Sequence, residues 1–131
     1  MNKKNYIALA KKSAKIQIDE LKKINKVFNN SFAEAINLII NAKGKIIFSG
    51  VGKNSFISKK SAATFSSVGI PSFFVDPTGA SHGDMGQIEK KDILIIISNS
   101  GNTTELSNIL KFANRFRIKI IGISSNSKSM L

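Results

Sequence analysis

Residues 93–105 read ILIIISNSGNTTE, and the fold can be worked out from this stretch. Its five consecutive apolar residues predict a strand that is buried on both faces, since a half-exposed strand would alternate apolar and polar positions. The residues that follow are rich in hydroxyl groups and lead into a helical pattern. The apolar positions of that pattern are Leu106, Ile109, Leu110 and Ala113. We therefore predict a strand, a hydroxyl-rich turn and the start of a helix.

The turn after this strand has the chemistry of an anion site. A helix N-terminus leaves unpaired backbone N–H groups and a partial positive charge, and neighbouring hydroxyls add further donors, so the arrangement suits a phosphate. A second interpretation stays open, because Ser100 or Asn102 would also serve as an ordinary helix cap.

The composition limits what the chain can be. Its 131 residues correspond to one domain, and a hydrophobic content of 42% is enough for a core. The absence of Cys excludes a disulfide framework and a cysteine zinc site, and one His leaves little room for a histidine metal site. The N-terminal residues are interrupted by lysines and form neither a signal peptide nor a membrane span. We expect a soluble, cytoplasmic protein that has no membrane partner.

The formal net charge of +12 raises the question of a nucleic-acid partner. Eight of the 20 basic residues precede Val27, where only Asp19 and Glu20 oppose them. With one Tyr and no Trp, the sequence offers no stacking platform of exposed aromatics. Because a Lys-rich helix is usually a solvated face, nucleic acid is not an expected partner, and the basic balance favours anionic small molecules.

Two helices are predicted before the first strand. Between Asn5 and Phe28, apolar residues recur every seven positions, which predicts an amphipathic helix with a Lys-rich back. Such a helix would pack on its own domain or on a partner subunit, and both alternatives stay open. Residues 31–34, Ser-Phe-Ala-Glu, form a capping box that starts a second helix. We divide the chain into a helical segment, residues 1–30, and a domain, residues 31–131.

A short apolar run at residues 45–48 predicts the first strand and leads into a Gly-rich turn, residues 49–54. The glycines permit a tight turn and a close approach to a ligand, and Lys53 stands where the next helix begins. The turn is not a Walker A loop and lacks the third glycine of the dinucleotide fingerprint. Lys53 is therefore either a site residue or an ordinary surface lysine.

Two further strands are predicted at residues 72–75 and 118–123. A polar, Gly-rich loop at residues 76–86 holds the single His82, which is either a structural residue or part of a site. Strands that alternate with helices predict an α/β fold in which helices cover both faces of a parallel sheet. In a flavodoxin-like order the first and third strands are neighbours, which brings residues 50–54 beside residues 98–103 at the ligand-binding edge.

Five short motifs distinguish the sequence. They are GVGK at 50–53, AATF at 62–65, PSFFV at 71–75, SHGDMG at 81–86 and SNSG at 98–101. In this order and spacing the chain resembles a sugar isomerase (SIS) domain from about Ile36 onward, and within that group the D-arabinose 5-phosphate isomerases. The His-Gly-Asp segment separates these enzymes from other sugar-phosphate binders. The resemblance implies a three-layer α/β sandwich with four strands here and a fifth beyond residue 131.

The resemblance also implies an activity, the interconversion of D-ribulose 5-phosphate and D-arabinose 5-phosphate for synthesis of the Kdo sugar of lipopolysaccharide. No cofactor and no metal are expected. The implied partners are a phosphorylated pentose substrate and further copies of the chain, a tetramer in the family. The alternative is a phosphosugar sensor, as in SIS-containing transcription regulators, which binds without turnover.

Carried over by position, the resemblance marks three candidate catalytic residues. Glu105 is the candidate acid/base, Lys53 would steady charge on the sugar, and His82 matches an active-site His of the family. Which group takes the proton stays open. The candidate substrate- and phosphate-binding residues are Gly52, Asn54, Ser55, Ser98, Asn99, Ser100 and Thr103.

Three positions depart from the family's pattern. Asn54 and Ser55 stand where the family usually has Ser-Gly, so an amide replaces one phosphate hydroxyl unless Ser55 substitutes for it. Asn102 replaces a commoner Glu, and Asp76 replaces a frequent His. The family also continues with further helices, another catalytic Glu and His, and a pair of CBS regulatory domains. We therefore expect the domain to be incomplete at residue 131.

Overall fold

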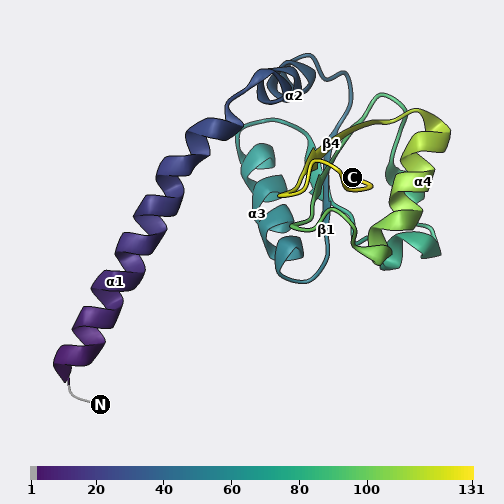
Figure 1. The fold of residues 1–131 in the computed structure, drawn as a ribbon. Coiled ribbons are helices and arrows are strands. Elements are labelled where there is room, and N and C mark those ends of the chain that lie inside the picture. Colours follow the sequence, from purple (N-terminus) through teal and green to yellow (C-terminus); the bar gives the residue numbers. More distant parts are fainter. Residues whose placement is uncertain (1–2) are drawn as a thin grey trace. The chain divides into compact units, whose positions relative to one another are not determined.

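The computed structural model describes residues 3–131, except for the side chains of Ser81 and His82. The chain divides between Asn37 and Leu38 into two compact units. Figure 1 shows the order of the elements along the chain.

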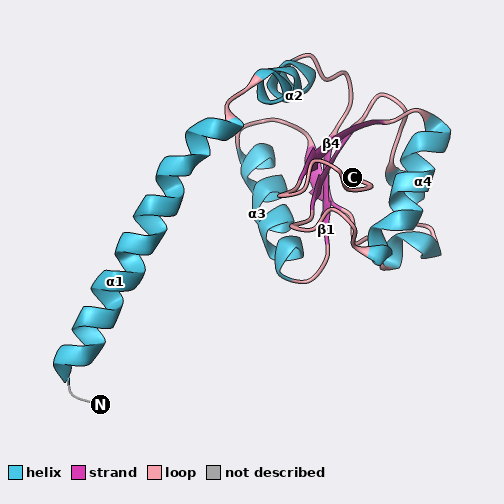
Figure 2. Ribbon diagram, viewed as in Figure 1, coloured by secondary structure: helices cyan, strands magenta, loops and turns pink. Residues whose placement is uncertain are grey.

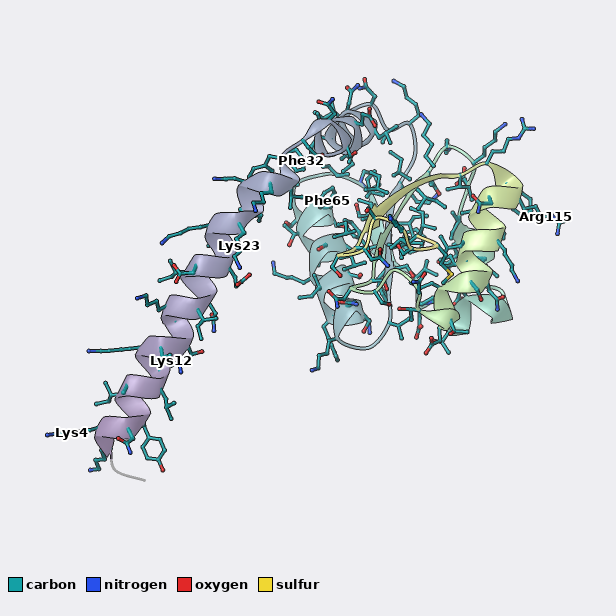
Figure 3. All side chains as sticks on the ribbon, viewed as in Figure 1. Lys4, Lys12, Lys23, Phe32, Phe65 and Arg115 are labelled. Atoms are coloured by element: carbon teal, nitrogen blue, oxygen red, sulfur yellow. The ribbon has the colours of Figure 1, made fainter. Side chains whose placement is uncertain are left out.

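The first unit is helical. Helix α1, Lys3–Lys22, is followed directly by a 3₁₀ helix, η1, Lys23–Val27, so the predicted amphipathic helix tightens before it ends. Its described residues are all exposed within this chain, including the apolar side chains of Ile7, Ile16 and Leu21. The lysines project from the helix surface, as Lys4, Lys12 and Lys23 do in Figure 3. The apolar stripe of α1 therefore stays exposed within this chain.

Helix α2, Asn30–Ile40, starts differently from the prediction. The side-chain oxygen of Asn29 accepts a hydrogen bond from the backbone N–H of Phe32 at 3.2 Å. Asn29 is thus the N-cap, and the predicted capping box beginning at Ser31 is wrong. Asn caps a helix as well as Ser does, so two adjacent candidates could not be separated by residue type.

The second unit is built on one parallel sheet (Figure 2). Its strands are β1, β2, β3 and β4, and their order across the sheet is β2-β1-β3-β4 with every pair parallel. This order confirms the predicted flavodoxin-like arrangement, in which the first and third strands are neighbours. The strand bounds are Ile46–Gly50, Ser72–Phe74, Ile93–Ile97 and Lys119–Ile123.

Two hydrophobic cores form on the opposite faces of this sheet. Alternate residues of β3 enter different cores, because successive side chains of a strand point to opposite faces. One core lies under α3, Lys53–Ser67, where the rings of Phe48 and Phe65 meet edge to face with centroids 5.2 Å apart. The other lies under α4, Ser107–Phe116. Helices α3 and α4 cover the two faces in Figures 1 and 2, which confirms the predicted three layers.

The polar loop at residues 76–86 contains more regular structure than its composition suggested. It forms two short 3₁₀ helices, η2, Gly79–His82, and η3, Asp84–Gln87. Ala80 is buried and joins the core under α4, so the loop contributes to packing. The side chain of His82 lies outside the described part of the structure, and its role stays a prediction.

Candidate functional site

Strand register brings three loops together at the carboxyl edge of the sheet. Gly50, the last residue of β1, pairs with Ile97 of β3, and Ile97 pairs with Ile123 of β4. The segments that follow therefore leave the sheet side by side. We call them the β1 loop, residues 50–54, the β3 loop, residues 98–103, and the β4 loop, residues 124–126. Parallel α/β sheets bind ligands at this edge.

The β1 loop depends on glycine at its start. A Cβ atom on Gly50 would lie 3.0 Å from the carbonyl oxygen of Ile97 and 3.0 Å from the Ser58 hydroxyl, so a larger residue would push β1 and β3 apart. Gly52 has a φ of +60°, and no atom lies within 4 Å of the place that a Cβ atom would take there, which leaves open space above the loop. Backbone N–H groups are accessible in such a turn.

Helix α3 starts at Lys53, whose side chain is exposed. Asn54 is half-buried on the first turn, and Ser55 donates its hydroxyl to the carbonyl oxygen of Gly52 at 2.7 Å. The Ser55 hydroxyl is thus engaged with the backbone of the β1 loop. Of Asn54 and Ser55, Asn54 is the residue that lines a pocket together with the β3 and β4 loops.

The β3 loop is held in shape by its own buried hydroxyl. Ser98 is 1% exposed, its Oγ lies 2.8 Å from Oγ1 of Thr103, and it also accepts the N–H of Gly101 at 3.1 Å. Gly101 has a φ of +69°, which favours glycine, and a Cβ there would overlap the side chain of Ser129. Ser98 and Thr103 therefore close the loop, while Ser100 is exposed beside them.

Neither Ser100 nor Asn102 caps the following helix, so the capping interpretation is wrong for both. The chain first makes a 3₁₀ turn, η4, Thr104–Leu106, and its N-cap residue Thr103 makes no side-chain cap bond. The Ser100 hydroxyl instead accepts the N–H of Asn102 at 3.2 Å. The Asn102 side chain accepts the N–H of Met130 at 2.9 Å, which ties the β3 loop to the segment after β4.

The β4 loop completes the site, and sequence reasoning assigned it no site residue. The carbonyl oxygen of Asn99 accepts the N–H of Ser125 at 3.0 Å, the Ser125 hydroxyl at 2.6 Å and the Ser124 hydroxyl at 3.2 Å. These bonds join residues 25 and 26 positions apart, and only the strand order creates them. The signal that could have found them is a third serine-rich turn after a predicted strand.

A pocket spans the three loops. It lies at the ends of β3 and β4, which contribute Ile97 and Ile123. Its polar lining consists of Asn54, Asn99, Ser124 and Ser125. The two amides come from the β1 and β3 loops, so the structure places these sequence-predicted residues against one space. Amide and hydroxyl groups both donate and accept hydrogen bonds, which suits a polyol.

Other sequence-predicted residues are not part of the lining of this pocket. Lys53 and Glu105 are both exposed, one at the start of α3 and the other on η4. Ser98 is buried; its hydroxyl accepts the Gly101 N–H and shares a hydrogen bond with Thr103, in which either hydroxyl can be the donor. The catalytic and binding roles assigned from sequence remain predictions.

The titratable groups with shifted pKa values lie away from this edge. The pKa of Lys45, which precedes β1, is raised chiefly by its side-chain bond to Glu89, and Asp92 adds to the effect. The pKa of Glu89 is lowered chiefly by the same bond to Lys45, and then by Lys91. These groups sit at the amino ends of β1 and β3, opposite the three loops, so they belong to the scaffold.

Residues 3–131 contain neither a metal-binding cluster nor a membrane-spanning helix. Among the described residues, no group of three or more His, Asp or Glu side chains is placed to hold a metal ion. Within the same range, no helix combines the length and the apolar character needed to cross a bilayer.

The fold and the three loops define a doubly wound α/β domain whose site lies at the carboxyl edge of β1, β3 and β4. Residues 38–131 match the model of the SIS domain, and the chain belongs to the SIS domain family. Arabinose 5-phosphate isomerase KdsD of Francisella tularensis is 41% identical over 130 residues, which are 97% of this chain and 40% of that protein. The chain thus spans about two fifths of the length of the curated relatives it matches.

Two solved structures show the same fold. A structure from Escherichia coli CFT073 in complex with arabinose 5-phosphate is 38% identical, has a TM-score of 0.86, and is matched over 100% of this chain and 70% of that chain. A putative sugar-phosphate isomerase from Listeria monocytogenes is 27% identical, has a TM-score of 0.93, and is matched over 99% of this chain and 69% of that chain.

Proposed function

We propose that the protein is an aldose-ketose isomerase that interconverts D-ribulose 5-phosphate and D-arabinose 5-phosphate. The observation that carries this proposal is the shared pocket of the β1, β3 and β4 loops, in a chain that is 38% identical to a protein solved with arabinose 5-phosphate. The relatives named arabinose 5-phosphate isomerase support the same substrate.

The reaction moves one proton between neighbouring carbons. A base removes a proton from C1 of the ketose, an enediol forms, and a proton is then delivered to C2 while the carbonyl passes to C1. Charge develops on the two sugar oxygens during this step, so a fixed positive group beside them lowers the barrier. The protein must therefore hold the phosphate at one end and present an acid/base group and a cation to the other.

We assign these tasks to the residues at the carboxyl edge. Glu105 is the proposed acid/base, and Lys53 at the start of α3 is the proposed cation. Ser100 and the N–H groups of the β3 loop are the proposed phosphate donors, with Ser98 and Thr103 keeping the loop closed. His82 is a further candidate that stands on η2. Asn54 and Asn99 line the polyol part of the pocket.

The wider setting of this activity is also a proposal. We infer that the protein acts in the cytoplasm, that its product feeds Kdo and lipopolysaccharide synthesis, and that it is a homo-oligomer. The exposed apolar stripe of α1 supports the last point, since a stripe of this kind is usually covered in an assembly. We retain residues 1–30 as the helical segment and residues 31–131 as the domain.

The test is a direct assay of isomerisation. The entire product of the coding frame that contains residues 1–131 is incubated with D-ribulose 5-phosphate, and the appearance of D-arabinose 5-phosphate is followed by chromatography. We expect conversion in the absence of added metal. A Glu105→Gln variant should lose about 100-fold or more in kcat with a small change in KM, since general acid–base catalysis contributes about 10²–10⁴-fold.

The matched control is Glu34→Gln, an exposed carboxylate on α2 that is in no proposed role. It should keep the full rate. Binding of D-arabinose 5-phosphate without any conversion would instead favour the phosphosugar sensor. Full activity of the Glu105→Gln variant would remove Glu105 from the mechanism and leave the assignment of the base to Lys53 or His82.

A further inference from the structure

The β3 loop lies between two other loops, and it makes different contacts on its two sides. Because the strand order is β1-β3-β4 in this part of the sheet, the β1 loop flanks it on one side and the β4 loop on the other. All three loops leave strands that end in register at Gly50, Ile97 and Ile123.

The carbonyl group of Asn99 is fixed on the β4 side. It accepts the Ser125 N–H at 3.0 Å and the Ser125 hydroxyl at 2.6 Å, and the Ser124 hydroxyl, 3.2 Å away, shares its one proton between this oxygen and the carbonyl oxygen of Asn126 at 3.5 Å. A carbonyl oxygen has two lone pairs, so three donors occupy all of its accepting capacity. The peptide unit that joins Asn99 to Ser100 cannot turn without breaking these bonds.

The same peptide unit carries the N–H of Ser100. A trans peptide is planar, and its C=O and N–H point in opposite directions. With the carbonyl held toward Ser124 and Ser125, the N–H of Ser100 points away from the β4 loop. Gly52 leaves open space at the β1 loop, which flanks the β3 loop on the other side. Within the described residues, this N–H has no hydrogen-bond acceptor. It is available as a donor to a ligand held between the β1 and β3 loops.

The geometry points to Ser124 and Ser125 as positioning residues that aim the Ser100 N–H at the phosphate of the substrate. This inference rests on the proposed function, because it identifies the ligand group as a sugar phosphate. The two hydroxyls act through the Asn99 carbonyl and need not touch the substrate. A backbone N–H that is already aimed at an anionic oxygen loses no orientational freedom on binding, and its bond to a charged acceptor is stronger than a neutral one.

The segment after the β4 loop reinforces this arrangement. Asn126 donates its N–H to the Ser124 hydroxyl at 3.1 Å, so the hydroxyl that reaches Asn99 is itself oriented. Ser129 packs directly over Gly101, and Met130 bonds the side chain of Asn102. The β3 loop is therefore supported from the β4 side along its length, while the β1 side carries the open space.

The experiment removes the two hydroxyls and measures phosphate recognition. In the product of the coding frame containing residues 1–131, a Ser124→Ala/Ser125→Ala variant is compared with the wild type. We expect its dissociation constant for D-arabinose 5-phosphate to rise about tenfold, which corresponds to the loss of one to two ordinary hydrogen bonds. KM should rise by a similar factor and kcat should change less, since the reacting carbons are not touched.

A spectroscopic readout separates positioning from a general loss of structure. The ¹⁵N–¹H resonance of the Ser100 amide is followed during titration with inorganic phosphate and with D-arabinose 5-phosphate. In the wild type it should shift downfield with either probe, and in the double alanine variant the shift should be smaller. A Ser124→Thr/Ser125→Thr variant keeps both hydroxyls and should restore the shift.

The matched control is Ser127→Ala, because Ser127 is exposed and its hydroxyl makes no bond to another described residue. It should leave affinity and the Ser100 resonance unchanged. An unchanged dissociation constant in the double alanine variant, or a Ser100 amide that neither probe moves, overturns the inference while leaving the isomerase assay untouched. If phosphate moves this amide but D-arabinose 5-phosphate does not bind, the inference stands and the proposed substrate is wrong.

Discussion

Replacement of Asp92 by Asn should destabilise the sheet at its amino edge, opposite the site. Asp92 is 1% exposed and directly precedes β3. One carboxylate oxygen accepts the N–H of Lys45, the residue before β1, at 2.7 Å. The other accepts the N–H of Glu89 at 2.8 Å and lies 3.2 Å from the Lys45 ammonium. One carboxylate thus links the starts of the two central strands.

The size of the loss follows from these contacts. Asn retains one oxygen, so one of the two backbone N–H groups would face an amide NH₂ and lose its acceptor. A hydrogen bond to a charged group contributes about 1.5–3 kcal/mol, and the remaining bond would weaken when the charge is removed. The Lys45 side chain is 28% exposed, so the ion pair itself adds little. We expect the free energy of unfolding to fall by about 2–4 kcal/mol, a large part of the ~5–15 kcal/mol of a typical domain.

Urea denaturation followed by circular dichroism measures this loss. With a slope of about 2 kcal/mol per molar urea, inside the usual range of about 1–3, the midpoint should fall by about 1–2 M at an unchanged slope. Asp19→Asn is the matched control, because Asp19 is an exposed aspartate on α1 that pairs with Lys22, and such surface changes stay within about 0.5 kcal/mol. A loss below about 1 kcal/mol for Asp92→Asn would refute the reasoning, since the buried carboxylate would then contribute no more than an ordinary neutral bond.

Two further predictions concern the loops and the pH dependence. Gly69 and Gly101 both have positive φ, so Ala at either position should cost about 1 kcal/mol in strain. Gly101→Ala should cost more and should also weaken phosphate binding, because its Cβ would overlap a neighbouring side chain. Gly69 has open space at the same place. If urea denaturation shows a smaller loss of unfolding free energy for Gly101→Ala than for Gly69→Ala, this prediction is wrong. The lowered pKa of Glu89 implies a contribution to stability that is present above pH 4.5 and is lost as the pH falls through the folded-state value. The raised pKa of Lys45 implies a contribution that is present below pH 10.5 and is lost as the pH rises through its folded-state value. The free energy of unfolding should be measured against pH on the acid and the alkaline side. Glu89→Gln should reduce its dependence on pH in the acid range, and an unchanged dependence there would exclude the pair of Glu89 and Lys45 as its source.

The parts of the fold that depend on local pattern were predictable. Five apolar residues in a row gave β3 with the bounds Ile93–Ile97, because a fully buried strand has no competing periodic pattern. The parallel sheet also followed, since the alternation of strands and helices leaves few topologies once crossovers are right-handed, and the assumed flavodoxin-like order is the one observed. The start of α2 was missed by two residues, because Asn29 and Ser31 are equally good caps and only tertiary context selects one.

The parts that depend on contacts distant in sequence were not predictable. The Asn99 carbonyl meets Ser125 across 26 positions, and Lys45 meets Asp92 across 47. Residue type indicates that a serine or an aspartate needs a partner, but not which partner it finds. Sequence reasoning therefore gave the β4 loop no role, although its hydroxyls hold the Asn99 carbonyl of the β3 loop.

Two serines of the hydroxyl-rich run at residues 98–103 differ in burial, and the sequence pattern does not distinguish them. Ser98 is 1% exposed, and its hydroxyl bonds both Thr103 and the N–H of Gly101, so it holds the loop closed. Ser100 is exposed, and its N–H is directed away from the anchored Asn99 carbonyl. In the proposed function the phosphate binds Ser100 and its N–H, while Ser98 keeps the loop closed through Thr103 and Gly101. The same run of serines thus contains a buried residue that frames the loop and an exposed one that we propose as a binding group.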